Sequence, residues 1–472
     1  MAYFMLEDFA AGVDVRKTTI TAKPGSLRTL NNGFVNAGGE IEKRRKFALL
    51  ATAPANTAGI AAVSNSLYTF GTDTGVSVPA PLIYQKLTPS SGSPTISRVL
   101  DADSFQTGLF VIARMSDAST RRFYSGTQVV AASGLASRAH KSKMYVVEGD
   151  LVRFSAVNAP SDFAGAGSGF IDVTTQDQGS ADLLGIEEYY NNIILLGRRA
   201  VQVWFMDPDP NLNQIIQVLG NIGLVASQGV ARYGSGDVLF LSTTGIRSVR
   251  ARDGSNSAVV NDIGSPIDPI ITERRLSMSS ADADRIKGLI EPMTGHFWLV
   301  WNDNIYVLSY YPATKVTAWS IFTLPFTVDY AVAAGNRVVL RSGNDVYVYG
   351  GFTSAATALD NYIPGNTLAA EYDTTQCQFE TPMLDLGKPA HYKSFVGFDA
   401  AIEGSWMVEV NFDPLAPDAW VNIGTFSQST YSLARIPVQG YGTHIAIRMT
   451  SQGTGPARVG AIAIHHEMAE DD

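Results

Sequence analysis

The sequence predicts an all-β protein, a β-propeller of six or seven blades with an additional C-terminal β-sandwich. Three observations predict this fold class: short apolar runs alternate with polar turns, aromatic residues that favour strands make up 10% of the 472 residues, and hairpins recur along the chain. Residues 182–190 and 279–287 could each form one or two turns of helix. Two such short stretches cannot build a helical layer.

Seven hairpins can be identified from apolar runs separated by turn residues. They begin at residues 60, 109, 144, 193, 238, 297 and 338, on average about 46 residues apart. Gly, Asn and Asp recur at the turns because they tolerate the positive φ that tight hairpins need. A four-stranded blade takes roughly 40–50 residues, so each hairpin is expected to be the central part of one blade. The uneven spacing, with no WD or kelch signature, leaves unrelated meanders in a β-sandwich as the alternative.

The pattern divides the chain into three parts. Residues 1–47 alternate weakly and are expected to be extended and to pair with a sheet edge or a neighbouring subunit. Residues 48–365 carry the seven hairpins of the predicted propeller. Residues 366–472 hold five or more short strands separated by loops with Pro and Gly, which predicts a small sandwich with its own core.

Composition excludes several classes of protein. The 35 basic and 44 acidic residues give a net charge of −9, which argues against a general nucleic-acid binder. One cysteine, Cys377, excludes an internal disulfide or a thiolate zinc cluster, and without a recognisable base it is expected to be structural. No apolar run of about 18 residues and no basic leader is present, so neither a membrane anchor nor a signal peptide is expected. A charged fraction of only 17% predicts surface covered by a neighbouring subunit.

Metal ligation is not expected from the sequence. His465 and His466 are adjacent on a predicted strand and therefore point to opposite faces. Residues 207–213 copy the first half of a calcium loop, but Leu212 stands where that loop needs Gly and Val218 where it needs Glu. The two prolines of that stretch favour a rigid turn instead.

Catalysis is not expected either. No GxSxG elbow is present, and the glycine-rich residues 165–169 lack the following helix and lysine of a phosphate-binding loop. The acid pairs Asp101/Asp103 and Asp282/Asp284 are of a kind common in loops. We therefore predict a protein that is not an enzyme, with no catalytic, cofactor-binding or metal-binding residues and no cofactor.

The basic run of residues 43–46 is the densest local charge in the chain. It is short and has no interleaved aromatic residues, so a nucleic-acid contact is disfavoured. A solvated face or an electrostatic contact with a neighbouring subunit is expected. Trp204, Trp301 and Trp319 stand inside strand-like runs and are expected in the core.

A succession of short phrases covers about the first 310 residues. They resemble, in their order, the tail nozzle proteins of short-tailed bacteriophages, also called tail tubular protein B or packaged-DNA stabilisation proteins, whose opening reads gG.D.r, pG...l.N and G.i.kR. In chain order the phrases are Phe9–Arg16, Pro24–Asn31, Gly39–Arg45, Val147–Ser155, Asn158–Phe163, Asn192–Trp204, Gly220–Ser227, Gly236–Ser242 and Thr244–Val249.

The resemblance implies a structural virion protein of the phage tail. It implies a homo-oligomeric ring, generally a hexamer, that joins head to tail beside the adaptor protein and the tail fibre or tailspike proteins. Such a ring is a conduit and plug for genome retention and ejection, and DNA passes through it without sequence-specific binding. The acidic balance of the chain agrees with a conduit that does not hold DNA.

Two other functions stay open from the sequence. One is a propeller that binds glycans, or an enzyme that acts on surface sugars, with acids and aromatic residues on loops at the axis. The other is a host-receptor binder at the tail tip. The size of the assembled particle would separate a ring from a trimeric receptor binder.

Overall fold

The computed structural model describes residues 2–63, 65–90, 94–129, 133–174, 182–234, 236–250, 262–360, 371–430 and 436–468. Strands dominate this part of the chain, so the predicted all-β class is confirmed. The helices within it are short: α2 (Asp268–Leu276), α3 (Ser280–Ala283), and the 3-10 helices η2 (Pro210–Leu212), η3 (Ser265–Ile267), η4 (Pro312–Thr314) and η5 (Ala355–Thr357).

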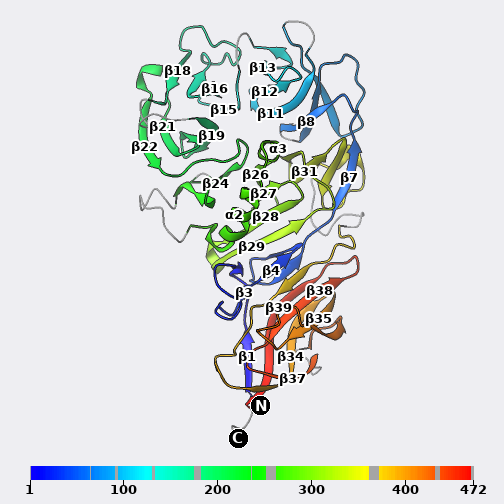
Figure 1. The fold of residues 1–472 in the computed structure, drawn as a ribbon. Coiled ribbons are helices and arrows are strands. Elements are labelled where there is room, and N and C mark those ends of the chain that lie inside the picture. The colour runs from blue at the N-terminus through cyan, green and yellow to red at the C-terminus, as the bar shows by residue number, and fades with distance from the viewer. Residues whose placement is uncertain are drawn as a thin grey trace.

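The upper part of the molecule is a β-propeller with seven blades around one axis (Figure 1). Each blade contributes three or four strands. In all seven blades the first strand lies innermost, next to the axis. The first blade has β8 (Ala58–Val63), β9 (Ser66–Gly71) and β10 (Leu82–Lys86); the second has β11 (Ile96–Phe105), β12 (Gly108–Met115), β13 (Thr120–Tyr124) and β14 (Thr127–Gln128); and the third has β15 (Ala136–His140), β16 (Lys143–Glu148), β17 (Leu151–Phe154) and β18 (Gly169–Asp172). The fourth blade has β19 (Leu183–Tyr189), β20 (Asn192–Gly197), β21 (Ala200–Phe205) and β22 (Gln214–Gly220), and the fifth has β23 (Val230–Tyr233), β24 (Asp237–Ser242) and β25 (Gly245–Ser248). The sixth blade has β26 (Lys287–Ile290), β27 (Phe297–Trp301), β28 (Asn304–Tyr311) and β29 (Val316–Thr323), and the seventh has β30 (Tyr330–Ala334), β31 (Arg337–Ser342), β32 (Asp345–Tyr349) and β7 (Phe47–Thr52).

The ring of blades is closed in two ways. Each innermost strand contacts the innermost strand of the next blade, and β30 of the seventh blade contacts β8 of the first. In addition, β7 precedes the first blade in the chain but pairs with β32 as the outermost strand of the seventh blade. The two ends of the propeller are therefore held in one sheet by backbone hydrogen bonds.

All seven predicted hairpins are present, one in each blade. In six blades the hairpin is formed by the second and third strands, as expected. In the first blade it is the inner pair β8–β9, and β10 pairs with β9 in parallel.

The helix expected at residues 182–190 is wrong, because this stretch is β19, the innermost strand of the fourth blade. Its first five residues are all buried. A strand buried on both faces has a continuous apolar run, which periodicity alone does not distinguish from a buried helix. The second expected helix is present as α3, whose N-terminus carries a capping box between Ser279 and Asp282.

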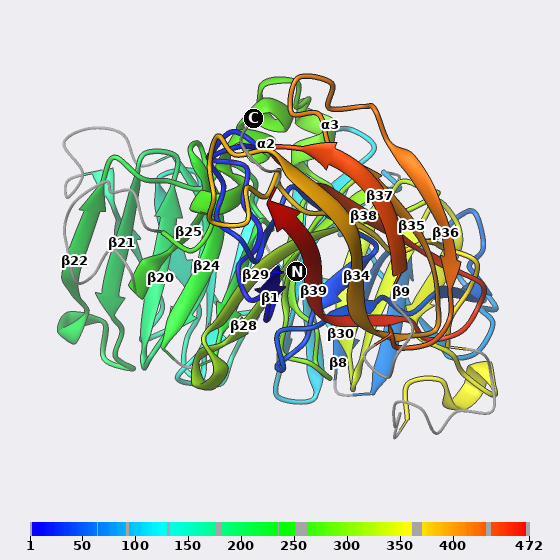
Figure 2. The same ribbon diagram turned by 90° about the horizontal axis from the view of Figure 1, so that it is seen from below.

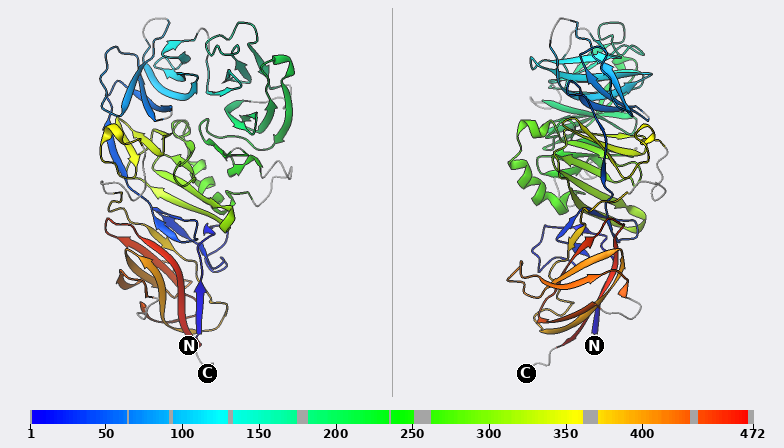
Figure 3. Two further views of the ribbon diagram at one scale, coloured as in Figure 1. Left: turned by 180° about the vertical axis from the view of Figure 1, so that it is seen from behind. Right: turned by 90° about the vertical axis from the view of Figure 1, so that its right-hand side faces the viewer.

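The lower part of the molecule is a β-sandwich that contains the first and the last of the described strands, β1 and β39 (Figure 3). The predicted sandwich of residues 366–472 therefore also takes strands from the N-terminal segment, which was expected to pair with a sheet edge. β1 and β39 are antiparallel neighbours. One sheet has the order β37 (Ile436–Gly442), β34 (Lys393–Glu403), β39 (Arg458–Met468), β6 (Ile41–Lys43) and β5 (Gly33–Val35), and β1 (Ala2–Leu6) pairs with β39.

The second sheet of the sandwich is continuous with the sixth blade of the propeller. The connecting strand is β4 (Thr29–Asn31), where Asn31 pairs in parallel with Ile321 of β29. Figure 2 shows β28 and β29 beside the sandwich strands from below. Beyond β4 the sheet continues through β33 (Gln378–Glu380), β38 (Ala446–Gln452), β35 (Ser405–Asn411) and β36 (Val421–Phe426), while β2 (Gly12–Val13) pairs with β29 and with β3 (Ser26–Leu27).

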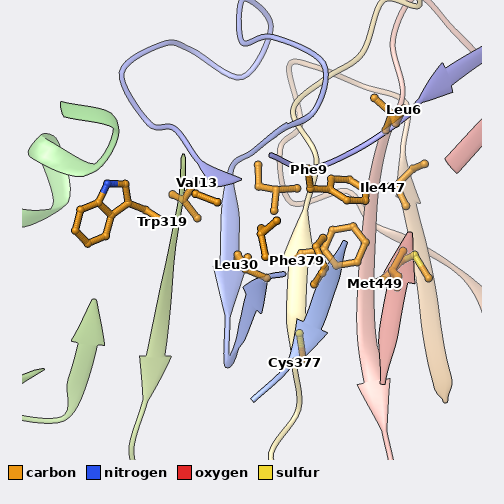
Figure 4. Packing of buried hydrophobic residues seen from close by; sticks show 14 of the residues in the cluster. Leu6, Phe9, Val13, Leu30, Trp319, Cys377, Phe379, Ile447 and Met449 are labelled. Atoms are coloured by element: carbon orange, nitrogen blue, oxygen red, sulfur yellow. The ribbon is translucent and has the colours of Figure 1, made fainter. Parts of the chain in front are cut away.

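One apolar core crosses this junction. Trp301 and Trp319 of the sixth blade belong to the same buried cluster as Phe379 and Trp406 of the sandwich. Figure 4 shows Val13 and Leu30 between Trp319 and Phe379. The shared core and the continuous sheet make the propeller and the sandwich one mechanical unit. Trp204, the third tryptophan expected in the core, is also buried.

Candidate functional site

The propeller axis gathers charged side chains from the innermost strands. Arg138 of β15 donates to Glu187 of β19 at 2.7 Å, and its guanidinium lies 3.8 Å from Asp103 of β11. Glu188 of β19 accepts from His140 at 2.9 Å and also forms an ion pair with Arg232 of β23. Ion pairs therefore connect the second, third, fourth and fifth blades around the axis.

The carboxylates around Arg138 stabilise its charged form. Burial by itself would lower the pKa of Arg138, but Glu187 and Asp103 outweigh it and raise that pKa. Burial raises the pKa of Asp103 and of Glu187 despite the nearby guanidinium. The arrangement is a shared, partly desolvated charge network of the kind that holds its members in fixed positions.

A second charge network closes the other side of the axis. Arg98 of β11 donates to the backbone carbonyls of Asp284 and Asp329, each at 2.7 Å. Arg114 of β12 lies 2.5 Å from the Asp284 carboxylate, and Arg285 lies 2.9 Å from Asp329. Since Asp284 precedes β26 and Asp329 precedes β30, this network connects the second blade to the sixth and seventh.

Two small cavities remain between the innermost strands. Their volumes are about 100 Å³ and about 190 Å³, and Asp101, Gln228 and Lys287 line both. Asp101 accepts from the backbone N–H of Ser137 at 2.6 Å, and the Lys287 ammonium donates to Gln228 at 2.5 Å. Both volumes are below the ~300 Å³ at which small-molecule pockets usually begin. Around these cavities the charge networks hold the innermost strands of different blades together.

The two acid pairs of the sequence, Asp101/Asp103 and Asp282/Asp284, lie in different parts of the propeller and have different partners. Asp101 and Asp103 lie at the axis, where each carboxylate accepts a backbone N–H of β15. Asp282 caps α3, and Asp284 joins the second charge network. The basic partners of these acids, Arg138, Arg98 and Arg114, carry no local motif and lie on other blades, so the sequence does not indicate them.

The expectation of a solvated or intersubunit role for residues 43–46 is wrong for the first two residues of the run, Lys43 and Arg44. Lys43 is 1% exposed, and its ammonium donates to the carbonyls of Asp373 at 2.8 Å and Gly453 at 3.0 Å. Arg44 is 2% exposed and lies over the ring of Phe47, 5.2 Å from its centroid.

These basic side chains serve the junction between the two parts of the molecule. The Arg44 guanidinium donates to Asn32 at 3.0 Å, and Arg45 lies 3.3 Å from the carboxylate of Glu371. Lys43 ends a sandwich strand, and Phe47 begins the closing strand of the propeller. A short run that crosses from one core to the other is buried because it has chain on every side.

Cys377 lies in the shared core next to this junction. It is fully buried, its N–H donates to Ser451 at 2.8 Å, and a Cβ at Gly33 would lie 2.4 Å from its sulfur. Burial raises the pKa of Cys377 to about 12. The thiol is neutral and packed, which agrees with the structural role expected from the sequence.

The remaining sequence candidates are held in local structure. His465 and His466 lie on β39 and differ in burial; His465 contacts Asp399 at 2.8 Å, and His466 is buried. Residues 207–213 form a turn closed by Asn213, which accepts from the N–H of Asp207 at 2.8 Å. In the ranges that the structure describes, no three His, Cys, Asp or Glu side chains are grouped as metal ligands. Nor does any helix there have the length and apolar character to cross a membrane.

The three N-terminal phrases meet in the fold, where a Cβ at Gly25 of the second phrase would lie 3.0 Å from the carbonyl oxygen of Asp8. The N–H of Phe9 donates to the carbonyl of Gly39 at 2.8 Å, and a Cβ at Gly39 would lie 2.8 Å from the Cβ of Asp8. Gly12 has φ +57° and approaches Trp319 so closely that a Cβ would lie 2.6 Å from its backbone nitrogen. Only glycine fits there without moving β29. The phrases therefore build the contact between the N-terminal segment and the sixth blade.

No family model and no curated protein matches the sequence. Among solved structures, the extracellular domain of a putative one-component system from B. thetaiotaomicron is similar at 8% identity and a TM-score of 0.41, over 66% of this chain and 40% of that chain. This chain thus spans about two fifths of that protein's length. The WD40 domain of Pan2 from Neurospora crassa is similar at 11% identity and a TM-score of 0.37, over 65% of this chain and 95% of that chain. The fold assignment rests on the sheet topology of the chain itself.

Proposed function

We propose that the protein is a non-catalytic structural subunit of the tail nozzle ring of a short-tailed phage. The ring, generally a hexamer in the family that the sequence resembles, would be a conduit and plug for the genome. It would sit in the virion tail between the adaptor protein and the tail fibre or tailspike proteins.

The observation that carries the proposal is the ordered succession of phrases together with the place where its opening converges. Phe9, Gly12 and Gly39 meet at the base of the sixth blade, where the sandwich joins the propeller. A motif that fixes how two parts of a molecule are joined is expected in a protein whose shape is its function.

The junction and the axis support a mechanical role. A continuous sheet and a shared core would transmit force between propeller and sandwich without a hinge. Charge networks and two small cavities lie between the innermost strands, so we place the passage of DNA at the centre of a ring of copies and not in the propeller of one copy.

Electron microscopy of the purified full chain, viewed down the particle axis, tests the proposal. A closed ring with a hole of duplex-DNA width is the expected result. A monomer, or a compact trimer with no central hole, would contradict it.

A host-receptor- or glycan-binding propeller protein is the second candidate, and one observation favours it. The rings of Tyr392 and Tyr441 on the sandwich stack at 4.9 Å between centroids, and the two residues are 54% and 60% exposed. Exposed aromatic faces are surfaces on which sugar rings can pack. Binding to host-cell glycans that Tyr392→Ala abolishes would favour this function over the nozzle.

A further inference from the structure

We propose that copies of this chain associate side by side through two outermost propeller strands, β22 of one copy and β7 of the next. The inference rests on the proposed ring and names the surface that forms it. Neither strand was singled out by the sequence motifs.

The two strands differ from the other outermost strands that have a free edge. β22 has seven residues and β7 has six, and neither contains a charged residue. Among the described strands, the other outermost ones are shorter. Three of them carry a charge, β10 with Lys86, β18 with Asp172 and β25 with Arg247, and the two-residue β14 pairs at Thr127 with Thr88. Proteins usually protect long edge strands with charge, proline or a bulge, because an unprotected edge pairs with another chain. β22 and β7 have neither charge nor proline, and each has one bulge in the ladder to its inner neighbour, opposite Val203/Trp204 of β21 and opposite Val346/Tyr347 of β32.

Exposed aliphatic side chains follow both edges. On β22, Ile216 is 54% and Val218 is 38% exposed, and Leu212 in the preceding turn is 57% exposed. On β7, Leu49 is 52% exposed. Among the described residues, β22 pairs only with β21, and β7 pairs only with β32.

The positions of β22 and β7 in the propeller favour a second copy of this chain as the partner of each strand edge. β22 belongs to the fourth blade and β7 to the seventh, which is as near to opposite as a seven-bladed ring allows, and Figure 1 shows them on opposite rims. A contact between two different edges of the same chain is heterologous, and its repetition closes into a ring or continues as a filament.

Strand direction adds a charge match. Each of the two strands lies three antiparallel steps out from the innermost strand of its blade, so both run in the same sense along the propeller axis. Neighbouring copies with aligned axes would therefore pair them in parallel. Parallel pairing brings Lys46, just before β7, to the same end as the turn of residues 207–213 that precedes β22 and contains Asp207 and Asp209.

The proposed register matches the first residues of the two strands. Phe47 then lies beside Gln214, and Leu49 lies beside Ile216, so two of the exposed aliphatic side chains meet. The paired blades would form one sheet of eight strands across the contact.

Cysteine crosslinking tests the contact, and the buried Cys377 gives no background. The full chain carrying both Leu49→Cys and Ile216→Cys is treated with a short bis-maleimide crosslinker. The expected result is a ladder of dimers, trimers and larger species on a denaturing gel, while each single variant stays monomeric. Dimers from Ile216→Cys alone, or no ladder from the double variant, would overturn the proposal.

Charged substitutions at the edge give an independent test. Ile216→Lys with Val218→Lys is expected to reduce the particle to monomers in sedimentation, at an unchanged melting temperature. Phe170→Lys on β18 is the matched control, because Phe170 is 59% exposed on another outermost strand. Equal loss of assembly in both variants, or in neither, would contradict the proposed edge.

The failure of this inference and that of the proposed function can be told apart. A ring with a DNA-sized hole that does not crosslink through these strands would contradict the proposed contact between β22 and β7 and would still support the nozzle function. A closed assembly that crosslinks through these strands but has no such hole would support the contact between β22 and β7 and would contradict the nozzle function.

Discussion

Arg138 and Glu187 meet at 2.7 Å on the propeller axis and join the innermost strands of the third and fourth blades. The Glu187 side chain is only 9% exposed, so the pair is much less hydrated than a surface ion pair. Removing one member leaves the other charge without its main partner in a partly desolvated site.

Arg138→Ala is therefore expected to lower the free energy of unfolding by about 3 kcal/mol. Urea unfolding followed by tryptophan fluorescence measures the change. The control is Asp182→Asn, which breaks the exposed pair with Arg198, where both side chains are more than half exposed. That change is expected to cost less than about 1 kcal/mol, and equal effects of the two variants would contradict a special role for the axis.

Arg44 offers a test of the junction. Because its guanidinium is buried over Phe47 and donates to Asn32, Arg44→Ala should lower the free energy of unfolding by about 2–4 kcal/mol. Limited proteolysis should then cut between sandwich and propeller faster than in the parent. Lys46→Ala is the control, since Lys46 is half-buried at the end of the same run, and its loss should change stability by about 0.5 kcal/mol or less. Equal sensitivity at both positions would argue against a buried junction.

The seven hairpins could be predicted because each lies within a short stretch of chain, where apolar runs and turn residues carry the information. The roles of Lys43, Arg44 and Arg138 could not. Asp373 and Gly453, which bind Lys43, lie 330 and 410 residues further along the chain. A charged run is normally solvated, and only the long-range pairing of the N-terminal strands with the sandwich buries this one. β19 was misread for a related reason, since closure of the ring buries both of its faces.

His296 gives a prediction for acid pH. It is 3% exposed, its Nε2 lies 2.8 Å from the hydroxyl of Tyr311, and burial lowers its pKa from 6.5 to about 3. Between pH 6.5 and 3 the unfolded state binds a proton that the folded state does not, so stability falls as the pH decreases through this window. The slope from this group is about 1.4 kcal/mol per pH unit.

Melting temperatures of the parent and of His296→Gln, measured from pH 7 to pH 4, check this. The parent should lose stability more steeply than the variant, whatever the other groups contribute to both. Parallel curves would show that His296 is not buried in its neutral form.

Cys377 gives the corresponding prediction at alkaline pH. Burial raises the pKa of its thiol from 9.0 to about 12, so between these values the unfolded state loses a proton that the folded state keeps. Stability should therefore fall as the pH rises above 9, and Cys377→Ala should remove that part of the loss. A thiol reagent at pH 8 should label the folded protein far more slowly than the protein in urea, and rapid labelling of the folded protein would contradict the burial.

The last prediction concerns DNA. A conduit that bound phosphates would slow the passage of the strand, so its surface should repel the duplex. The net charge is −9 per chain, and two of the four residues of the basic run, Lys43 and Arg44, are buried in the junction. Repeated around the proposed ring, this charge would keep the duplex away from the wall, over a screening length of about 8 Å at physiological ionic strength. The assembled protein should therefore show no shift of duplex DNA in a gel, even at low salt, where phosphate contacts are strongest.

Tight, salt-sensitive binding would contradict the passive conduit and would require a basic surface elsewhere on the ring. Lys46→Ala should leave the result unchanged, because a single half-buried lysine cannot supply the several phosphate contacts that such binding needs.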